Sequence, residues 1–316
     1  MAKVPLKPAT TVAQQIEKLR GRGMRVDEAF ASQWLANVSY YRLSAYWFPA
    51  RIVDDNGIRS DRFAPGTSFQ DAAALYEADR KLRTLVHDGT ERIEIALRTR
   101  IGDAISVDDP LAYEDSSNFR GGFDHAKWLT TAHSRVTRAG RRNEAIKHYA
   151  SKYEGCYPFW VLAEVLDFSD VSRLYEGIPP QVQQEVAENL RIDIDYSVMD
   201  SRKRRAVLAN PPLARWLEQL TIVRNACAHH ARLWNKSFVP APTNALRTIP
   251  ALRGLPLGQS ERMYGVLVVM SYLLRVVSPG TTWPDKVTEL VNAAFLTNPI
   301  VQASSLGIPE DWGGAF

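Results

Sequence analysis

Residues 68–105 carry the sequence SFQDAAALYEADRKLRTLVHDGTERIEIALRTRIGDAI, the longest stretch of the chain with a single repeating pattern. Its apolar side chains recur at intervals of three, four and seven residues, at Leu75, Leu82, Val86, Ile93, Leu97 and Ile101. This spacing places them along one stripe of an α-helix, and charged side chains occupy the opposite face. The stretch therefore predicts one long amphipathic helix, which the Asp88-Gly89 pair can bend.

The rest of the chain shows the same helical pattern, interrupted by Pro and Gly. Further helices are predicted over residues 11–20, 26–35, 39–47, 124–152, 158–175, 179–190, 213–234, 260–277 and 285–295. Residues 54–66 predict a loop or a short hairpin, and no other segment has the two-residue period of a strand. The fold class is therefore all-α. We expect a helical N-terminal region over 1–66, a helical core over 67–238, and a Pro-rich linker with C-terminal helices over 239–316.

The composition is that of an ordinary globular chain. The 316 residues are 45% hydrophobic and 23% charged, and the net charge is +4. About 29 of the 39 basic residues are Arg. The planar Arg side chain pairs with phosphate better than the point charge of Lys, although a GC-rich genome also favours Arg. This mildly basic balance permits nucleic-acid binding without requiring it.

The sequence contains no signal for a membrane, an oxidising compartment or a bound metal. Its N-terminus has no apolar leader segment. The longest apolar run, near Val266–Leu274, is far shorter than the roughly 20 residues of a membrane-spanning helix. Cys156 and Cys227 form no CxxC pair, and no Cys/His set has the spacing of a zinc site. We therefore expect a cytoplasmic protein with no metal and no cofactor.

A candidate for chemistry is the sequence RNACAH at residues 224–229, within the helix predicted over 213–234. Asn225 and His229 are four residues apart and share a helix face, and the long side chain of Arg224 can reach the same point. RNA cleavage by the neighbouring 2′-hydroxyl needs a group that moves protons near neutral pH, as His does. It also needs a fixed cation for the charge that builds on phosphorus, as Arg provides. The nucleophile belongs to the RNA, so no metal is required, and the products are a 2′,3′-cyclic phosphate and a 5′-hydroxyl.

The Arg-x4-His spacing by itself is a weak signal, because six His and about 29 Arg give roughly half a match by chance in a chain of this size. A second match, from Arg120 to His125, spans a Gly-Gly break, and we interpret it as accidental. For an isolated pair, the simpler interpretation of His229 would be a buried His bonded to a core carboxylate.

The surrounding sequence gives the motif more weight. Residues 224–235, RNACAHHARLWN, resemble the signature of the Abi-like proteins, a bacterial abortive-infection family. Three further blocks resemble blocks of the same family: YYRLS followed by YW at residues 40–47, the stretch at 75–98, and PFW followed by EVL and FS at 158–169. In order and spacing these blocks cover roughly residues 10–240, and the tail after Pro240 carries no such resemblance.

This resemblance implies a HEPN-type helical bundle with N- and C-terminal helical extensions, and a metal-independent ribonuclease in phage defence or a toxin–antitoxin pair. It implies His229 as general acid/base, Arg224 as phosphate stabiliser, and Asn225 as a group that orients the RNA or His229. Ribonucleases of this type usually combine two such motifs in one cleft. Because this chain has one credible motif, we predict a homodimer in which the two His229 residues face each other across the two-fold axis. Some relatives are restrained by a structured small RNA, so RNA can be a regulator as well as a substrate.

The residues around the motif can have either a functional or a structural role. His230 points about 100° away from His229 on a helix, which favours a supporting or structural role. Cys227 is interpreted as a small packed residue. The face formed by Glu91, Glu94 and Arg98 either holds Arg224 or His229 in place or is solvated, with internal ion pairs.

Two other groups of side chains also have open roles. Basic clusters either contact RNA backbone or are solvated surface: Arg138, Arg141, Arg142, Arg202, Lys203, Arg204 and Arg205. Early aromatic residues either stack on bases or belong to the core, and their apolar block favours the core: Tyr40, Tyr41, Tyr46 and Trp47. The alternative function is a non-catalytic HEPN module that binds RNA or a partner protein; a target of nucleotide transfer in an antitoxin complex is a third interpretation.

Overall fold

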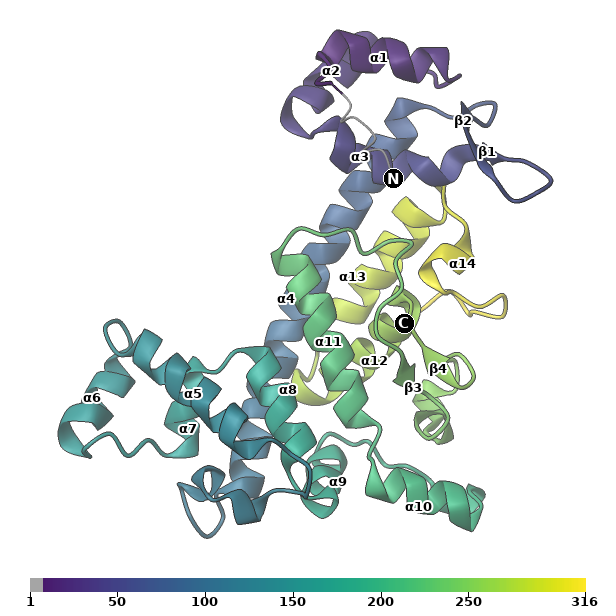
Figure 1. The fold of residues 1–316 in the computed structure, drawn as a ribbon. Coiled ribbons are helices and arrows are strands. Elements are labelled where there is room, and N and C mark those ends of the chain that lie inside the picture. The colour runs from purple at the N-terminus through teal and green to yellow at the C-terminus, as the bar shows by residue number, and fades with distance from the viewer. Residues whose placement is uncertain (1–7) are drawn as a thin grey trace, which may run out of the picture. The chain divides into compact units, whose positions relative to one another are not determined.

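The computed structural model describes residues 8–316, and these residues are helical nearly throughout (Figure 1). They form fourteen α-helices and two small antiparallel sheets of two strands each. The all-α prediction is confirmed. No helix among the described residues combines the length and the apolar character needed to cross a membrane. The prediction that the N-terminus has no apolar leader segment concerns, in part, residues 1–7, which lie outside the described residues.

Internal contacts divide the chain into two compact units. Unit 1 contains the described residues up to Leu82 together with Thr288–Ser304, and unit 2 contains Arg83–Val287 together with Ser305–Phe316. The units are divided at other positions than residues 66 and 238, where domain boundaries were predicted. The predicted domain boundaries remain a prediction. Every motif residue proposed for chemistry belongs to unit 2.

Unit 1 is built from short capped helices and one hairpin. Its elements are α1 (Val12–Gly21), α2 (Glu28–Asn37), α3 (Tyr40–Trp47), β1 (Arg51–Val53), β2 (Arg59–Phe63) and the first turns of α4 (Phe69–Ile105). Thr11, Asp27 and Ser39 each accept a hydrogen bond from a backbone N–H of the first helical turn, which satisfies one otherwise unpaired donor. The hairpin of β1 and β2 confirms the short hairpin that the loop-like sequence allowed.

The aromatic block at residues 40–47 contributes mainly to the core of unit 1. Trp47 is fully buried and Tyr46 is buried with its hydroxyl donating to Asp79 Oδ2 at 2.7 Å. The preference for a core role is confirmed for these two residues. It is wrong for Tyr41, which is 88% exposed because α3 presents it to solvent.

The long helix α4 continues unbroken through Asp88-Gly89. A Cβ at Gly89 would approach the side chains of Met270 and Trp283 to 2.9 Å. These two residues come from α12 (Met263–Val277) and the start of α13 (Trp283–Leu290), and Trp283 Nε1 donates to the Leu85 carbonyl at 2.6 Å. Gly89 therefore serves close packing rather than a helix break.

Two predicted helices are each divided in the structure. The segment 124–152 forms α5 (His125–Ala139) and α6 (Glu144–Lys152), and the segment 158–175 forms α7 (Phe159–Leu162) and α8 (Phe168–Gly177). New helix starts explain both divisions: Asn143 caps α6, and Asp167 forms a capping box with Asp170 at the start of α8. The helix α9 (Pro180–Asn189) begins at its proline as predicted.

The Pro-rich segment at 240–256 is packed rather than a linker. Ala241, Leu246 and Leu255 are buried, and Trp216 Nε1 of α11 (Leu213–Ala228) donates to the Pro242 carbonyl at 2.8 Å. The segment contains β3 (Ala241–Pro242), which pairs with β4 (Gln259–Ser260). The last helix of the chain is α14 (Ala303–Leu306). The linker prediction is wrong because proline content reports an irregular backbone and carries no information about burial.

Candidate functional site

The motif residues lie at the C-terminal end of α11, where the helix stops six residues before its predicted end. His229 is the C-cap, the N–H of His230 donates to the Cys227 carbonyl at 3.0 Å, and the N–H of Ala231 donates to the Ala226 carbonyl at 2.8 Å. This pair of bonds is a Schellman motif, in which the residue after the cap adopts a left-handed conformation. His230 has that conformation, with φ of 54°, at a position that usually favours glycine.

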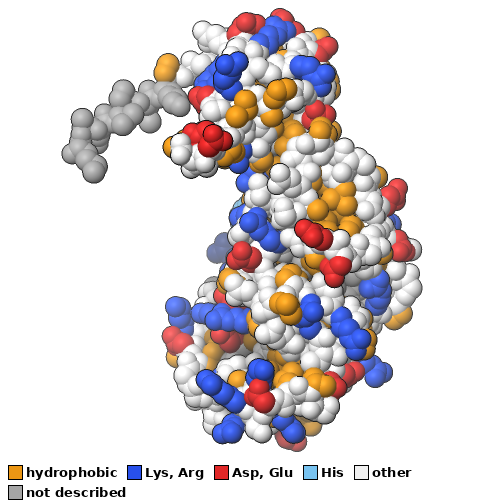
Figure 2. Space-filling model, turned by 90° about the vertical axis from the view of Figure 1, so that its right-hand side faces the viewer, with side chains coloured by type: hydrophobic (Ala, Val, Ile, Leu, Met, Phe, Trp, Pro, Cys, Tyr) orange, Lys and Arg blue, Asp and Glu red, His pale blue; other side chains and the backbone are white. Residues whose placement is uncertain are grey.

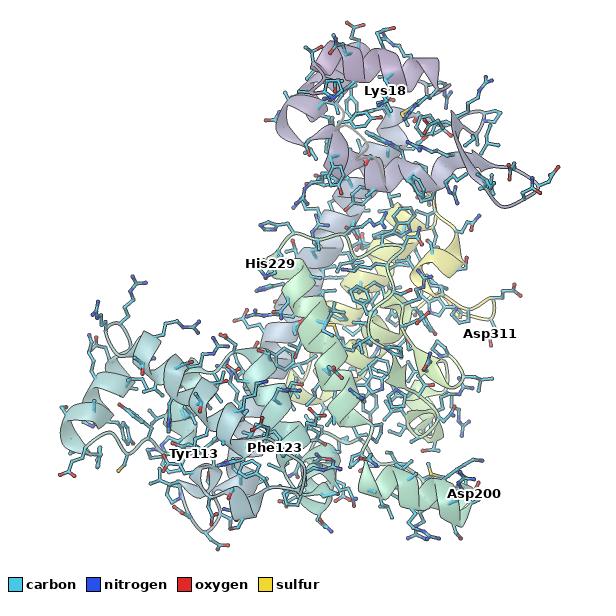
Figure 3. The ribbon with its side chains drawn as sticks, viewed as in Figure 1. Lys18, Tyr113, Phe123, Asp200, His229 and Asp311 are labelled. Atoms are coloured by element: carbon cyan, nitrogen blue, oxygen red, sulfur yellow. The ribbon has the colours of Figure 1, made fainter. Side chains whose placement is uncertain are left out.

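Exposure divides the motif into a buried and an open side. Ala226 and Cys227 are buried, so Cys227 is the packed residue expected from the sequence. Asn225 and His229 are exposed. The backbone N–H of His229 donates to the Asn225 carbonyl at 3.0 Å, so the two residues are one helical turn apart. Figure 3 labels His229 at this end of α11.

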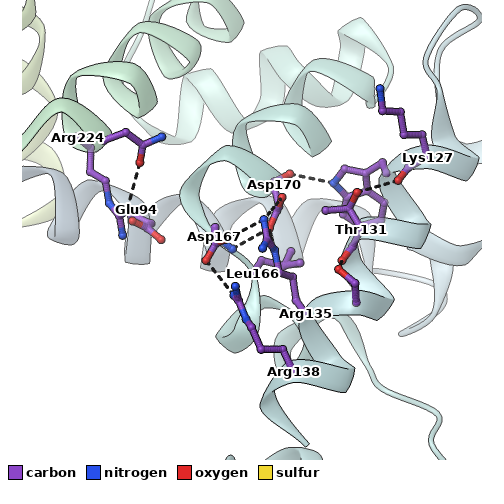
Figure 4. Close-up of polar contacts among 12 residues, drawn as sticks. Glu94, Lys127, Thr131, Arg135, Arg138, Leu166, Asp167, Asp170 and Arg224 are labelled. Atoms are coloured by element: carbon purple, nitrogen blue, oxygen red, sulfur yellow. Dashed lines mark hydrogen bonds and ion pairs between the residues drawn. The ribbon is translucent and has the colours of Figure 1, made fainter. Parts of the chain in front are cut away.

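Arg224 is half-buried beside the open side of the motif. Its Nη1 donates to Oδ1 of Asn225 at 3.3 Å, which turns the guanidinium toward the neighbouring amide (Figure 4). The same close-up draws Glu94 of α4 in the region of Arg224. The exposed part of the site thus offers a cation, an amide and an imidazole within five consecutive helix positions and the cap.

The segment after the motif, residues 231–234, is held by hydrogen bonds at both ends. Arg83 of α4 is buried, and its Nη1 donates to the Ala231 carbonyl at 3.4 Å. Leu233 and Trp234 are fully buried, and Trp234 Nε1 donates to Ser305 Oγ at 2.7 Å. The apolar flank of the sequence motif therefore fixes the loop that carries the two histidines.

An ion-pair network holds α8, the helix that packs against α11. Arg135 of α5 donates from Nε to Asp170 at 2.8 Å and contacts Asp167 at 2.8 Å, and Arg138 also contacts Asp167 (Figure 4). The hydrogen bond that Arg135 donates to the Asp170 carboxylate raises the pKa of the Arg135 guanidinium. Sequence reasoning did not identify this network, although the Asp-x-x-Asp capping pattern at its centre was visible.

Glu91, Glu94 and Arg98 do not act as one face. Glu94 is 7% exposed and forms an ion pair with Arg98, whose Nη2 also donates to the Leu166 carbonyl at 2.7 Å. Glu91 is exposed. The solvated-face interpretation included an ion pair within this group, and the Glu94–Arg98 pair is present. It is largely buried rather than solvated. Through the Leu166 carbonyl, Arg98 connects α4 to the residues just before α8.

The basic cluster lies on a helix of its own, α10 (Ser201–Ala209), none of whose residues is fully buried. Arg202, Lys203, Arg204 and Arg205 are all exposed, and Lys203 pairs with Asp200 at 3.1 Å. Hydrogen bonds from Lys203 lower the pKa of the Asp200 carboxyl, which caps the helix. On the face shown in Figure 2, basic and acidic side chains are interspersed, in keeping with the small net charge. Contact of this cluster with RNA stays a prediction.

The second Arg-x4-His match, from Arg120 to His125, has a buried histidine, unlike the match at Arg224 to His229. His125 is 9% exposed, and its Nε2 lies 2.8 Å from the Tyr113 carbonyl. Its ring is packed 4.6 Å from that of Phe119, between centroids. Arg120 donates instead to the Asn210 side chain at 3.1 Å. This match belongs to the packed structure, in agreement with the interpretation that its spacing is accidental.

Comparison with known proteins identifies the family. A family model for Abi-like proteins matches residues 33–235, while no curated protein and no solved structure matches the chain. Within residues 8–316, no group of three or more His, Cys, Asp or Glu side chains is placed to hold a metal ion. The family match spans well over half of the chain and includes α4, α8 and the whole of α11 with its cap. The chain therefore belongs to the family of Abi-like proteins.

Proposed function

We propose that this Abi-like protein is a metal-independent RNA endonuclease of the HEPN type that acts in abortive infection or in a toxin–antitoxin pair. Family membership suggests the abortive-infection role. The observation that carries the enzymatic proposal is the exposure of Asn225 and His229, one turn apart at an anchored helix end, beside the guanidinium of Arg224. A structural interpretation would have these polar groups buried and bonded within the core, as His125 is.

The proposed reaction uses the RNA as its own nucleophile. A histidine removes the proton of a 2′-hydroxyl while the 2′-oxygen attacks the adjacent phosphorus, and the bond from phosphorus to the 5′-oxygen breaks. A proton is delivered to the leaving 5′-oxygen, which gives a 2′,3′-cyclic phosphate and a 5′-hydroxyl. Arg224 stabilises the negative charge that grows on the phosphoryl oxygens, and Asn225 orients Arg224 through the contact between their side chains.

This reaction needs one group to accept a proton and another to donate one, and each chain offers one exposed motif. We propose a homodimer in which the His229 residues of two copies face each other across the two-fold axis. The exposed stripe of α11 supports this arrangement, because Ile222 is 38% exposed one turn before Asn225 on the same open side of the helix. An apolar side chain at this position suits a contact with a second copy.

The enzyme proposal is tested with purified protein and a mixed-sequence RNA in buffer containing EDTA. Wild type is expected to cleave the RNA to fragments with cyclic phosphate ends, and His229→Ala is expected to be inactive with an unchanged melting temperature. His133→Ala is the matched control, because it replaces another exposed histidine, one that lies outside the motif. Equal activity, or equal inactivity on a broad set of RNAs, contradicts the proposal.

The dimer is tested separately by light scattering at micromolar concentration. Wild type is expected at twice the mass of the chain, and Ile222→Asp is expected to shift it toward the monomer and to reduce cleavage in parallel. A wild-type monomer that remains fully active contradicts the composite site but leaves the catalytic role of His229 standing.

The second candidate is a module that binds RNA without cleaving it, and the exposed basic side chains of α10 are the observation that favours it. An RNA that binds α10 can be a substrate or a regulatory small RNA. If protein with an intact motif binds RNA, and loses binding when Arg202, Arg204 and Arg205 become Ala, yet cleaves nothing, this candidate replaces the enzyme.

A further inference from the structure

A cleft of about 530 Å³ lies between α4 and α7 in unit 2, and the proposed chemistry does not use it. Its lining brings together two blocks that are separated in the sequence: the end of the long helix, with Ile95 and Arg98, and the segment PFW, with Trp160. Gly102 permits this meeting, because a Cβ there would come within 2.9 Å of the Phe159 ring. The glycine thus lets α7 approach α4 closely enough to form one wall of the cleft.

Trp160 is an unusual side chain for this position. It is 53% exposed, whereas its neighbours Phe159 and Val161 are buried. Ile95 is 55% exposed in the same cleft. An exposed indole next to a second exposed apolar side chain provides a flat surface on which a planar ring can stack.

Two polar atoms in this cleft are left without hydrogen bonds. The Nε of Arg98 and the Oγ of Ser106 are shielded from water, and neither has a partner among residues 8–316. Buried polar atoms of this kind are costly, and both of these belong to residues that line the cleft. The guanidinium of Arg98 is already held by Glu94 and the Leu166 carbonyl, so its position is fixed before any ligand arrives.

The charges of the cleft discriminate between parts of a nucleotide. Asp103 and Glu164 line it together with the single cation Arg98. Two carboxylates against one guanidinium disfavour a phosphate, whereas carboxylate oxygens accept hydrogen bonds from exocyclic amino groups. The cleft therefore suits the base of a nucleotide, and a base with an amino group better than uracil.

The cleft lies on the same helix that carries the anchor of the motif. Arg83 contacts the residue after His230, and Arg98 follows it by fifteen positions, roughly 22 Å along α4 at 1.5 Å per residue. A single strand bound at the motif reaches this far after several nucleotides.

We propose that the α4–α7 cleft is a base-binding subsite for single-stranded RNA, in which an unpaired adenine, guanine or cytosine several nucleotides from the scissile phosphate stacks on Trp160. This inference deepens the proposed function and rests on it for the identity of the strand. It assigns a role to the PFW block that the motif itself leaves unexplained. The carboxylates of Asp103 and Glu164 accept hydrogen bonds from the amino group at the edge of the stacked base.

The test measures binding without cleavage, on the full-length protein. The probes are fluorescein-labelled 12-mers of oligoadenylate and oligouridylate, 2′-O-methylated at every position so that no nucleophile is present, and the readout is fluorescence anisotropy. Trp160→Ala is expected to weaken oligoadenylate binding about 5- to 150-fold, the range for loss of one base stacked on an aromatic side chain. Trp160→Phe is expected to retain most of the affinity, and wild type to prefer oligoadenylate over oligouridylate.

The matched control is Tyr153→Ala, which removes another exposed aromatic ring of unit 2, 43% exposed and outside the cleft. Binding that is unchanged by Trp160→Ala, or reduced equally by Tyr153→Ala, overturns the subsite. Displacement of the 12-mer by AMP at equal concentration assigns the cleft to a free nucleotide and overturns the strand proposal.

The cleavage assay keeps the two proposals distinguishable. If wild type cleaves unmodified RNA and Trp160→Ala binds the 12-mer normally, the subsite fails and the enzyme stands. If Trp160→Ala loses binding and wild type cleaves nothing, the enzyme fails and a base-binding cleft stands.

Discussion

The chain contains two Arg-x4-His sequences, and the structure places them in opposite environments. His229 is an exposed helix cap whose neighbour Arg224 contacts Asn225. His125 begins a helix but is buried, bonded to a backbone carbonyl and packed against an aromatic ring. Identical spacing therefore leads in one case to an accessible polar cluster and in the other to a core contact.

The spacing of polar residues therefore defines a site only when the surrounding apolar residues turn them outward. In α11 the buried side is occupied by residues such as Val223 and Cys227, which leaves Asn225 and His229 facing away from the core. Around His125 the ring itself is part of the apolar packing. Replacement of the matching residue in each of the two Arg-x4-His sequences tests whether their roles differ.

The largest expected effect is on cleavage when the two histidines are compared. His229→Gln, which keeps a polar side chain but cannot transfer protons, is expected to lower the rate of RNA cleavage by about 10²- to 10⁴-fold. His125→Gln is expected to leave the rate per folded molecule within about threefold, because its ring does not reach the site. Initial rates on one RNA, normalised to folded protein by circular dichroism, check this. Comparable losses from both variants would remove the distinction between the two motifs.

The two arginines provide the next contrast. Arg224→Lys keeps the charge but loses the planar fork, and we expect cleavage to fall by about 10- to 100-fold. Arg120 contacts the Asn210 side chain, so Arg120→Lys is expected to change cleavage by less than about twofold. Measured values of kcat and KM decide the outcome; full activity of Arg224→Lys would show that only a charge is needed there.

For the free energy of unfolding we expect the opposite order, with the larger effect at His125 and the smaller effect at His229. His125→Ala removes a packed ring and leaves the Tyr113 carbonyl without its bond, and we expect the free energy of unfolding to fall by about 2–4 kcal/mol. His229→Ala, at an exposed cap, is expected to change it by less than about 0.5 kcal/mol. Urea denaturation followed by circular dichroism measures both. A larger loss for His229→Ala would mean that His229 is a structural residue.

The smallest expected effect concerns the cap itself. His230 occupies a left-handed conformation that glycine adopts without a steric cost, so His230→Gly is expected to raise the free energy of unfolding by about 0.5–1 kcal/mol. Cleavage should stay within a few-fold of wild type if His230 only supports the helix end. A strong loss of activity with unchanged stability would instead assign His230 a role in the reaction.

Much of the fold could be predicted because helical periodicity is a local property. The apolar stripe from Leu75 to Ile101 specified α4, and the prolines at 179–180 specified the start of α9. The failures came where local composition and tertiary packing disagree. The Pro-rich segment looked like a linker but is buried, and Gly89 looked like a bend but allows the close approach of Met270 and Trp283.

For the candidate site, the order of the side chains is enough to establish which residues are present and that the chain is an Abi-like protein. Packing between distant segments is what leaves His229 exposed and His125 buried, and it also brings Trp160 and Arg98 to the lining of one cleft. The physical reason is that exposure and contact depend on which distant segments pack together. Residues 98 and 160 are far apart in the chain, and no local pattern in either block reports the other.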